Sequence, residues 1–366
     1  MNETSLKSIA IHLPQFHPIP ENDIWWGKGF TEWTNVAKAK PLFKGHYQPH
    51  LPGDLGFYDL RLSEAREAQA ALAKEYGIYG FCYYHYWFNG QRFLNRPVDE
   101  ILKTKQPDFP FMICWANENW TRTWDGHDKQ VLIKQDYSDE DDLKHIHFLL
   151  KGVFSDPRYI RVGNKPFFLI YRPKLFPDIR KTLDSWRKEA RKAGFDDLYI
   201  GYMQSFSFTE APEKYGFDCA VEFQPDFANL PALIRPGYKE RIQNKFTEYT
   251  ASVYYSNKIV SYEAYVENAI RNDSVEFHVY KAVFPMWDNS PRRQKEAIIF
   301  RDSTPALYEK WLKHVASLTL QSQQQEKMIF INAWNEWAEG NHIEPCLKWG
   351  RSYLEATRNA LSAASR

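Results

Sequence analysis

The sequence predicts a (β/α)8 TIM barrel, a closed parallel sheet surrounded by helices, with long βα loops at its C-terminal face. Eight short apolar segments recur along the 366 residues, and helical patterns lie between them. The two longest connections both follow strands. Neither a linker nor an internal repeat divides the chain, so we expect residues 1–366 to form a single domain.

The eight strand candidates are continuous apolar segments bounded by turn residues. They cover residues 8–16, 77–88, 109–117, 165–173, 197–203, 218–224, 281–288 and 327–336. Most do not alternate between apolar and polar residues, which is expected for parallel strands that are covered on both faces. An open, doubly wound sheet is the alternative fold. The sequence contains neither GxGxxG nor GxxxxGK[ST], so nothing favours nucleotide binding on such a sheet.

Helical patterns fill most of the connections between these segments. The clearest cover residues 60–76, 177–193, 304–319 and 350–363, and a short one follows Pro97. Thr304 and Pro305 form a typical helix start, an N-cap residue followed by proline. The connections 17–58 and 225–262 are too long for plain loops and are expected to be functional. Because both follow strands, we expect both at the C-terminal face of the barrel, where active sites of this fold lie.

Composition limits the class of protein. The chain is 43% hydrophobic and 25% charged with a net charge of +1, which gives no electrostatic reason to expect binding to nucleic acid or an anionic membrane. No segment approaches the ~18 apolar residues of a membrane span, and the N-terminus lacks the apolar region of a secretory signal. We therefore expect a cytoplasmic protein. Four scattered cysteines are expected to be reduced and mostly in the core: Cys82, Cys114, Cys219 and Cys346.

Aromatic, amide, carboxylate and histidine side chains follow nearly every predicted strand. A single aromatic residue at a strand end is usually part of the core, but their recurrence at the same end of the strands indicates a site. Flat aromatic faces beside polar groups suit a sugar, so we expect an oligosaccharide or polysaccharide substrate. The residues predicted to bind it are His12, Gln15, His17, Trp33, Tyr84, His85, Trp87, Trp115, Asn117, Glu118, Trp120, Tyr202, Gln204, Glu222, Trp287, Asp288, Asn289 and Asn335.

Glu336 and Glu339 are the candidates for catalysis. Glycosidic cleavage requires an acid for the leaving oxygen and a second carboxylate as nucleophile or base. Two residues three apart on a regular strand point to opposite faces, so the chain must leave strand geometry by about residue 335 if both act in one site. The alternative is two solvated glutamates on a surface loop or first helical turn. Three further carboxylates are candidates for substrate binding, the first also for acid catalysis: Glu118, Glu32 and Glu222.

Other catalytic chemistries have less support. The chain contains no HExxH and no GxSxG, the signatures of zinc hydrolysis and of a serine nucleophile at a strand-to-helix turn. Two histidine pairs suggest a metal site: His46 with His50 in a proline-rich loop, and His145 with His147 in a helical pattern. The second pair is two apart and faces different sides of a helix. We predict that the protein uses neither a metal nor a cofactor.

Two C-terminal segments resemble glycoside hydrolase family 99, the endo-α-mannosidase group. Residues 335–345 (NEWAEGNHIEP) are similar to its NEWxEGxxIEP motif, and residues 287–292 (WDNSPR) to its aromatic-DN(T/S)PR segment on the seventh strand. The N-terminal half resembles instead the WbsX-type branch of family-99-like proteins, which is linked to lipopolysaccharide and other surface-glycan assembly. That half contains GFTEWTNV (29–36), YYHYWF (83–88) and WANENWTRTWDG (115–126).

The resemblance covers nearly the whole chain and implies a barrel with two catalytic glutamates, which fall on Glu336 and Glu339. It implies a retaining α-glycosidase for a manno-configured sugar. By this resemblance, Glu336 would remove the proton of the sugar's own 2-hydroxyl, which attacks C1 to give a 1,2-anhydro sugar. Glu339 would protonate the leaving oxygen and then activate the incoming water or acceptor.

This sequence departs from endo-mannosidases at Ala338, where they commonly carry a histidine, and over residues 1–130, which follow the other branch. Two other functions therefore remain open. One is a glycosyltransferase of polysaccharide biosynthesis that uses the same site. The other is a non-catalytic glycan-binding barrel, against which both intact glutamates count.

Overall fold

The computed structural model describes residues 6–122, 127–237, 252–273, 278–293 and 295–364. Its centre is a closed barrel of parallel strands in the order β1-β14-β12-β10-β9-β8-β4-β2, and β2 pairs with β1 to close it. This confirms the predicted fold, and each strand lies in or overlaps a predicted segment. The strands are β1 (Lys7–His12), β2 (Gly80–Phe88), β4 (Phe111–Trp115), β8 (Lys165–Ile170), β9 (Tyr199–Gln204), β10 (Cys219–Glu222), β12 (Val279–Val283) and β14 (Met328–Ile331).

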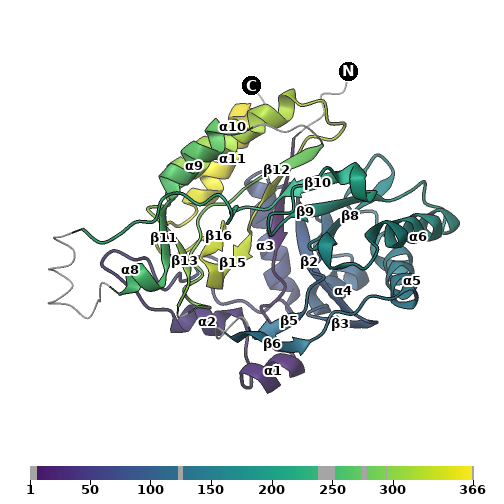
Figure 1. Ribbon diagram of the computed structural model, residues 1–366, viewed down its shortest axis with the longest axis horizontal. Coiled ribbons are helices and arrows are strands. Elements are labelled where there is room, and N and C mark those ends of the chain that lie inside the picture. Colours follow the sequence, from purple (N-terminus) through teal and green to yellow (C-terminus); the bar gives the residue numbers. More distant parts are fainter. Residues whose placement is uncertain (1–5, 123–126, 238–251, 274–277, 294, 365–366) are drawn as a thin grey trace.

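Helices surround this barrel. They are α3 (Ser63–Glu75), α4 (Arg96–Thr104), α5 (Asp139–Phe148), α6 (Ile179–Lys192), α9 (Tyr262–Arg271), α10 (Pro305–Gln321) and α11 (Ser352–Ala364). Helices α9, α10 and α11 lie together, and α5 and α6 lie beside each other on another side of the barrel (Figure 1). The five predicted helices are confirmed within a few residues.

A regular (β/α)8 barrel has a helix after every strand, and the described part of the chain departs from this pattern between β9 and β10. Between β9 and β10 the chain forms only a 3-10 turn, Pro212–Tyr215. The turn ends at Gly216, whose φ of +84° is left-handed and stops a helix from continuing.

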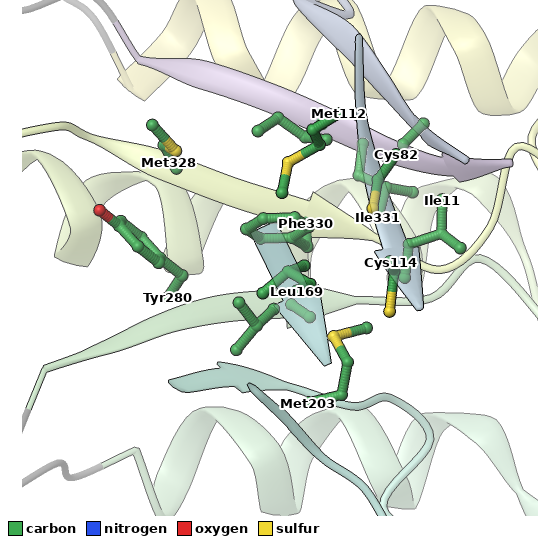
Figure 2. Packing of buried hydrophobic residues seen from close by; sticks show 14 of the residues in the cluster. Ile11, Cys82, Met112, Cys114, Leu169, Met203, Tyr280, Met328, Phe330 and Ile331 are labelled. Atoms are coloured by element: carbon green, nitrogen blue, oxygen red, sulfur yellow. The ribbon is translucent and has the colours of Figure 1, made fainter. Parts of the chain in front are cut away.

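The barrel interior is filled by apolar side chains from neighbouring strands. Figure 2 shows Met112, Leu169, Met203 and Phe330 close together inside the barrel. At Gly201 a Cβ atom would lie 2.6 Å from the Cys219 Sγ and 2.9 Å from the Leu169 Cδ2, so only glycine fits there. All four cysteines are free and buried, as predicted.

The long connections form additional small elements. Helices α1 (Pro20–Trp26) and α2 (Glu32–Lys38) follow β1. After β10 come α8 (Val253–Ser256) and β11 (Lys258–Ser261), and β11 pairs in parallel with β13 (Ile298–Arg301) from the loop after β12 (Figure 1).

Short strand pairs complete the loops of the described residues. They are β3 (Gln91–Phe93) against β2, β7 (Arg161–Val162) against β8, β5 (Trp120–Arg122) with β6 (His127–Ile133), and β15 (Asn335–Glu336) with β16 (Asn341–His342). The end of the predicted motif 115–126 and the middle of the connection 225–262 lie outside the described residues. No helix in the described part of the chain is long and apolar enough to cross a membrane.

Candidate active site

A cavity of about 680 Å³ lies at the C-terminal ends of the barrel strands. Residues that end or follow the strands line it, among them Gln15 after β1, Gln204 at the end of β9 and Asn332 after β14. Much of its wall is aromatic: Tyr84, Tyr86, Phe88, Trp120, Tyr171, Phe206, Phe223, Phe227 and Trp287. A site at this end of the strands is the one expected for a TIM barrel.

The loop after β14 brings Glu336 and Glu339 to this cavity. Strand β14 ends at Ile331, as the sequence argument requires, and Glu336 then lies in the short strand β15. A 3-10 turn, Trp337–Glu339, carries Glu339, and Gly340 at φ +57° reverses the chain into β16. A Cβ on Gly340 would lie 3.1 Å from the Asp288 backbone nitrogen, so the loop needs glycine for its close approach to Asp288.

Arg292 joins three carboxylates at the edge of the cavity. Its guanidinium nitrogens lie 3.0 Å from a Glu336 oxygen, 2.5 Å from a Glu339 oxygen and 2.7 Å from a Glu32 oxygen. The same Glu32 oxygen accepts a hydrogen bond from the Ala338 backbone N–H at 3.0 Å. Glu32 therefore positions both the Arg292 side chain and the turn between the two candidate catalytic residues. Glu336 is only 6% exposed, so the alternative of a solvated surface glutamate is wrong for this residue.

This cluster shifts the proton affinity of its members. Burial raises the pKa of Glu336 to about 8; Arg292 opposes that shift, whereas Glu339 and Glu32 add to it. Burial also raises the pKa of Glu32, again against the effect of Arg292. Burial lowers the pKa of Arg292, but its three carboxylate neighbours outweigh this and raise it. A carboxyl group that gains and loses a proton near neutral pH is suited to general acid–base catalysis.

Besides both glutamates, several predicted binding residues line the cavity: Gln15, Tyr84, Glu118, Trp120, Gln204, Trp287 and Asn289. Two of them have unused hydrogen-bond donors. The Gln15 Nε2 and the Trp287 Nε1 are buried and have no partner within the described part of the chain. A ligand with hydroxyl groups would supply the missing acceptors.

The alternation of side chains along β2 explains why some of the predicted binding residues do not line the cavity. Tyr84, Tyr86 and Phe88 line the cavity. The alternate residues His85 and Trp87 contact α5: the His85 Nε2 lies 3.0 Å from the His145 Nε2, and the Trp87 Nε1 donates to Asp141 at 3.0 Å. Successive side chains of a strand point to opposite faces, so only every second residue of YYHYWF reaches the cavity. Trp115 is also on the helix side, where it packs against Trp186 in α6.

Four more predicted residues have partners within the framework of the barrel. The His12 Nε2 lies 3.2 Å from the Gln69 Oε1, and burial lowers the pKa of His12 to about 3. Trp33 donates to the Tyr58 carbonyl at 2.8 Å, and Tyr202 donates to the Glu210 carbonyl. Glu222 accepts from Lys281 at 2.9 Å, which joins β10 to β12. None of the four lines the cavity, and neither does the buried His17.

The last three predicted residues outside the cavity hold the loops that surround it. Asn117 accepts from the Arg172 backbone N–H at 2.7 Å, and Asn335 accepts from the Leu13 N–H at 2.7 Å. Asp288 accepts from Gln48 and contacts His46, both at 2.6 Å. Burial raises the pKa of Asp288, but these hydrogen bonds outweigh burial and lower it. The structure thus brings these residues near the site as supports, and it does not bring them to the cavity.

Several cavity residues were not among those predicted from the sequence. Arg292 is the last residue of the segment 287–292 (WDNSPR), but the sequence did not predict that it belongs to the site. Tyr86 shares its strand face with Tyr84, and this alternation was the signal available for it. No comparable signal identified other cavity residues that come from loops or follow strands, among them Tyr171, Phe206, Phe223, Phe227 and Asn332.

The two histidine pairs do not converge on a common point. His46 contacts Asp288, while the His50 Nδ1 lies 3.0 Å from the His342 Nε2. His145 contacts His85, and the His147 Nε2 lies 2.9 Å from Glu189. Across the described residues, no group of three or more His, Cys, Asp or Glu side chains is arranged to hold a metal ion.

Comparisons with known sequences agree with the resemblance seen in the motifs. The family model described as "Glycosyltransferase WbsX" matches residues 8–357. Proteins named WxcX from two strains of Xanthomonas campestris pv. campestris are each 41% identical over 357 residues. These matches cover 97% of this chain but 50% of the relatives, so the chain spans about half the length of the curated relatives it matches.

Solved structures share the barrel at low sequence identity. Two structures of the GH99 endo-alpha-mannosidase from Bacteroides thetaiotaomicron, one in complex with bis-tris-propane, match with a TM-score of 0.57 each. They are 14% and 15% identical and cover 98% and 99% of this chain and 97% and 98% of their own. A glycoside hydrolase-like protein matches with a TM-score of 0.55 and 15% identity over 98% of this chain and 94% of its own. At these identities the likeness shows a common fold alone.

Proposed function

The chain belongs to the WbsX glycosyltransferase family, and on that premise we propose that it cleaves or transfers an α-glycosidic bond with retention of configuration. The proposed substrate is a manno-configured glycan of lipopolysaccharide or surface-polysaccharide metabolism, and residues 1–366 act as one domain. A single observation carries the proposal. Glu336 and Glu339, from one loop, both line the aromatic cavity and bind the two terminal nitrogens of Arg292.

In the proposed first step, the Glu336 carboxylate takes the proton of the sugar's 2-hydroxyl, and O2 attacks C1 as the bond from C1 to the leaving oxygen breaks. The Glu339 carboxylic acid gives its proton to that oxygen. In the second step, the Glu339 carboxylate takes a proton from water or from an acceptor hydroxyl, whose oxygen opens the three-membered ring at C1. Glu336 returns its proton to O2. Two inversions at C1 give net retention, and both glutamates regain their starting states.

Arg292 and Glu32 have supporting roles in this scheme. Arg292 holds both catalytic carboxylates through separate nitrogens, which fixes their relative position. Its positive charge favours the ionised form of Glu336, which a general base requires. Glu32 contacts Arg292 and the Ala338 N–H and so positions the group without lining the cavity.

The charges of the cavity favour a neutral glycoside over a nucleotide-sugar donor. Among the described residues that line it, Glu118, Asp226, Glu336 and Glu339 carry carboxylates, whereas guanidinium groups come from Arg292 and Arg293. Arg292 is already bound to three glutamates. A diphosphate would have to compete with these three carboxylates for the Arg292 guanidinium.

A glycosyltransferase remains the second candidate function, because the matching family is described as one. A hydrolase or transglycosylase should release reducing sugar, or transfer sugar, from an α-linked oligosaccharide or aryl α-mannoside alone. A nucleotide-dependent transferase should form product only from a nucleotide sugar with an acceptor. Both reactions should be followed by mass spectrometry, with the Glu339→Gln variant as the control. Transfer from a nucleotide sugar with no reaction of any glycoside would replace our proposal by the second candidate.

A further inference from the structure

Phe206 is an unusual feature of the cavity. It follows strand β9, lines the cavity and yet is 63% exposed. Its φ is +52° and that of Ser207, which also lines the cavity, is +59°. Two consecutive residues with side chains in the left-handed region are strained, and a bulky ring at such a position is a true outlier.

Neither the strain nor the exposure of this ring favours folding. An exposed phenyl ring loses the hydrophobic stabilisation of burial, and left-handed backbone at a non-glycine residue persists only where its surroundings impose it. Here the Ser205 hydroxyl donates to the Tyr171 carbonyl at 2.7 Å, and the Phe208 N–H donates to the Ser205 carbonyl at 3.1 Å. Strained residues of this kind gather at ligand sites, where the geometry serves binding.

The ring is also held in a fixed orientation. The Arg172 guanidinium lies 3.6 Å from the ring centroid, and the Tyr171 ring meets it edge-on at 6.1 Å. Arg172 is in turn bound to Glu118 at 2.8 Å, and Glu118 lines the cavity. An exposed ring that is supported in this way loses little conformational entropy when a ligand binds to it.

We propose that Phe206 is a stacking platform for a second sugar residue, next to the residue whose bond lies at Glu336 and Glu339. The apolar C–H face of a pyranose fits a flat ring, and the neighbouring Glu118, Gln204 and Ser207 offer polar groups for its hydroxyls. These polar neighbours favour a sugar over a lipid chain. The inference rests on the proposed function only in that the ligand is a glycan, and it predicts that the protein prefers oligosaccharides to single sugars.

The test is binding, measured by titration calorimetry on the full chain. The probes are oligosaccharides of one to four residues in the α-manno, α-rhamno, α-gluco and β-gluco series. For the wild type, affinity should rise by at least tenfold from one residue to the longer members of the series that binds. Phe206→Ala should lose most of that gain, and Phe206→Trp should keep it. Phe57→Ala, the same change at a ring that is 58% exposed and not among the cavity-lining residues, should bind as the wild type does.

Phe206→Gly separates binding from stability. It lacks the ring as Phe206→Ala does, but glycine accepts positive φ without strain. Its melting temperature should therefore exceed that of Phe206→Ala, while both variants lose the gain with length. A gain that survives in Phe206→Ala and Phe206→Gly would overturn the platform and leave the proposed function intact. Failure of the wild type to bind any probe would overturn both together.

Discussion

The segment 335–345 forms two buried carboxylate clusters that differ in one decisive respect. Glu344 accepts hydrogen bonds from the Trp337 Nε1 at 2.6 Å, the Gln69 Nε2 at 2.7 Å and the Tyr58 hydroxyl at 2.8 Å. Both of its oxygens are thus occupied, and it does not line the cavity. Glu336, eight positions earlier, lies at the cavity and is held by Arg292.

Burial and proton affinity do not distinguish the two residues. Glu344 is 2% exposed and Glu336 6%. Burial raises the pKa of Glu344 to about 7 and that of Glu336 to about 8. A carboxyl group with a strongly raised pKa is often taken as a catalytic candidate, and here that criterion would select both. Access to a ligand distinguishes the two residues: Glu344 and its three donors hold the loop, whereas Glu336 and Arg292 lie where a ligand can reach them.

The largest expected effect concerns the substrate of the Arg292 cluster. In α-mannosides O1 and O2 are trans, so O2 can attack C1 in line; in α-glucosides they are cis. We expect turnover of aryl α-mannosides, none of the gluco epimer, and none of the matched 2-deoxy compound, which lacks the attacking atom. Initial rates of leaving-group release measure this. Efficient cleavage of the 2-deoxy compound through a glycosyl–glutamate adduct would show a carboxylate nucleophile instead.

Arg292→Gln should have the next largest effect. It leaves Glu32, Glu336 and Glu339 without their shared cation, and breaking a buried ion pair from one side costs about 3–5 kcal/mol. The free energy of unfolding should be measured by urea denaturation between pH 5 and 9. The loss should be greatest at high pH. It should shrink at low pH, because the folded variant, in which the pKa values of Glu32 and Glu336 are raised further, then binds protons that relieve the repulsion. An equal loss at every pH would argue against charge as the cause.

Glu344→Gln should lower the stability of the protein but have only a small effect on its activity. At pH 8 the wild-type side chain is ionised, and an amide would place an N–H2 group against one of three donors, at a cost of about 1–3 kcal/mol. The cost should decrease below about pH 7, where the wild-type carboxyl is itself protonated. Activity per folded molecule should fall by less than about tenfold, well under the usual acid–base contribution. A loss as large as that of Glu336→Gln would erase the distinction between the clusters.

The smallest expected effect is a shift of the pH profile. A general base must be ionised, so kcat/KM should fall as the pH drops below the raised pKa of Glu336, about 8. The negative charge of Glu32 adds to this shift, so Glu32→Gln should move the acid limb to lower pH. A rate that instead falls as the pH rises through 8 would make Glu336 the acid and reverse the assigned roles.

Much of the fold was predictable because its signals are local. The eight barrel strands are continuous apolar segments, and α10 begins at the predicted Thr304-Pro305 start, where Thr304 accepts from the Leu307 N–H. Helix α9 was not predicted from the sequence, and α5 was predicted only as a helical pattern at His145 and His147, without bounds. Helix α5 begins with four acidic residues, Asp139 to Asp142, and its apolar face is interrupted by the buried His145. That face is recognisable only from its packing against the barrel.

The site was predictable in part for the same reason. Glu336 and Glu339 follow the last strand directly, and motif resemblance identified them. The alternation of side chains along β2 places Tyr86 at the cavity and the predicted residues His85 and Trp87 on the opposite face. Glu32 and Arg292 are 260 positions apart, and no local sequence pattern indicates that their side chains form an ion pair. Phe206 is likewise defined by its exposure and backbone angle, which the sequence does not reveal.

The most direct test compares Glu336→Gln, Glu339→Gln and Glu344→Gln in one assay. Each protein should first be shown to be folded by circular dichroism and its melting temperature, and kcat should then be measured on the glycoside that the wild type turns over. We predict that the two cavity variants lose on the order of 100-fold or more in kcat, whereas Glu344→Gln loses less than about tenfold. Wild-type turnover by folded Glu336→Gln or Glu339→Gln would contradict this prediction.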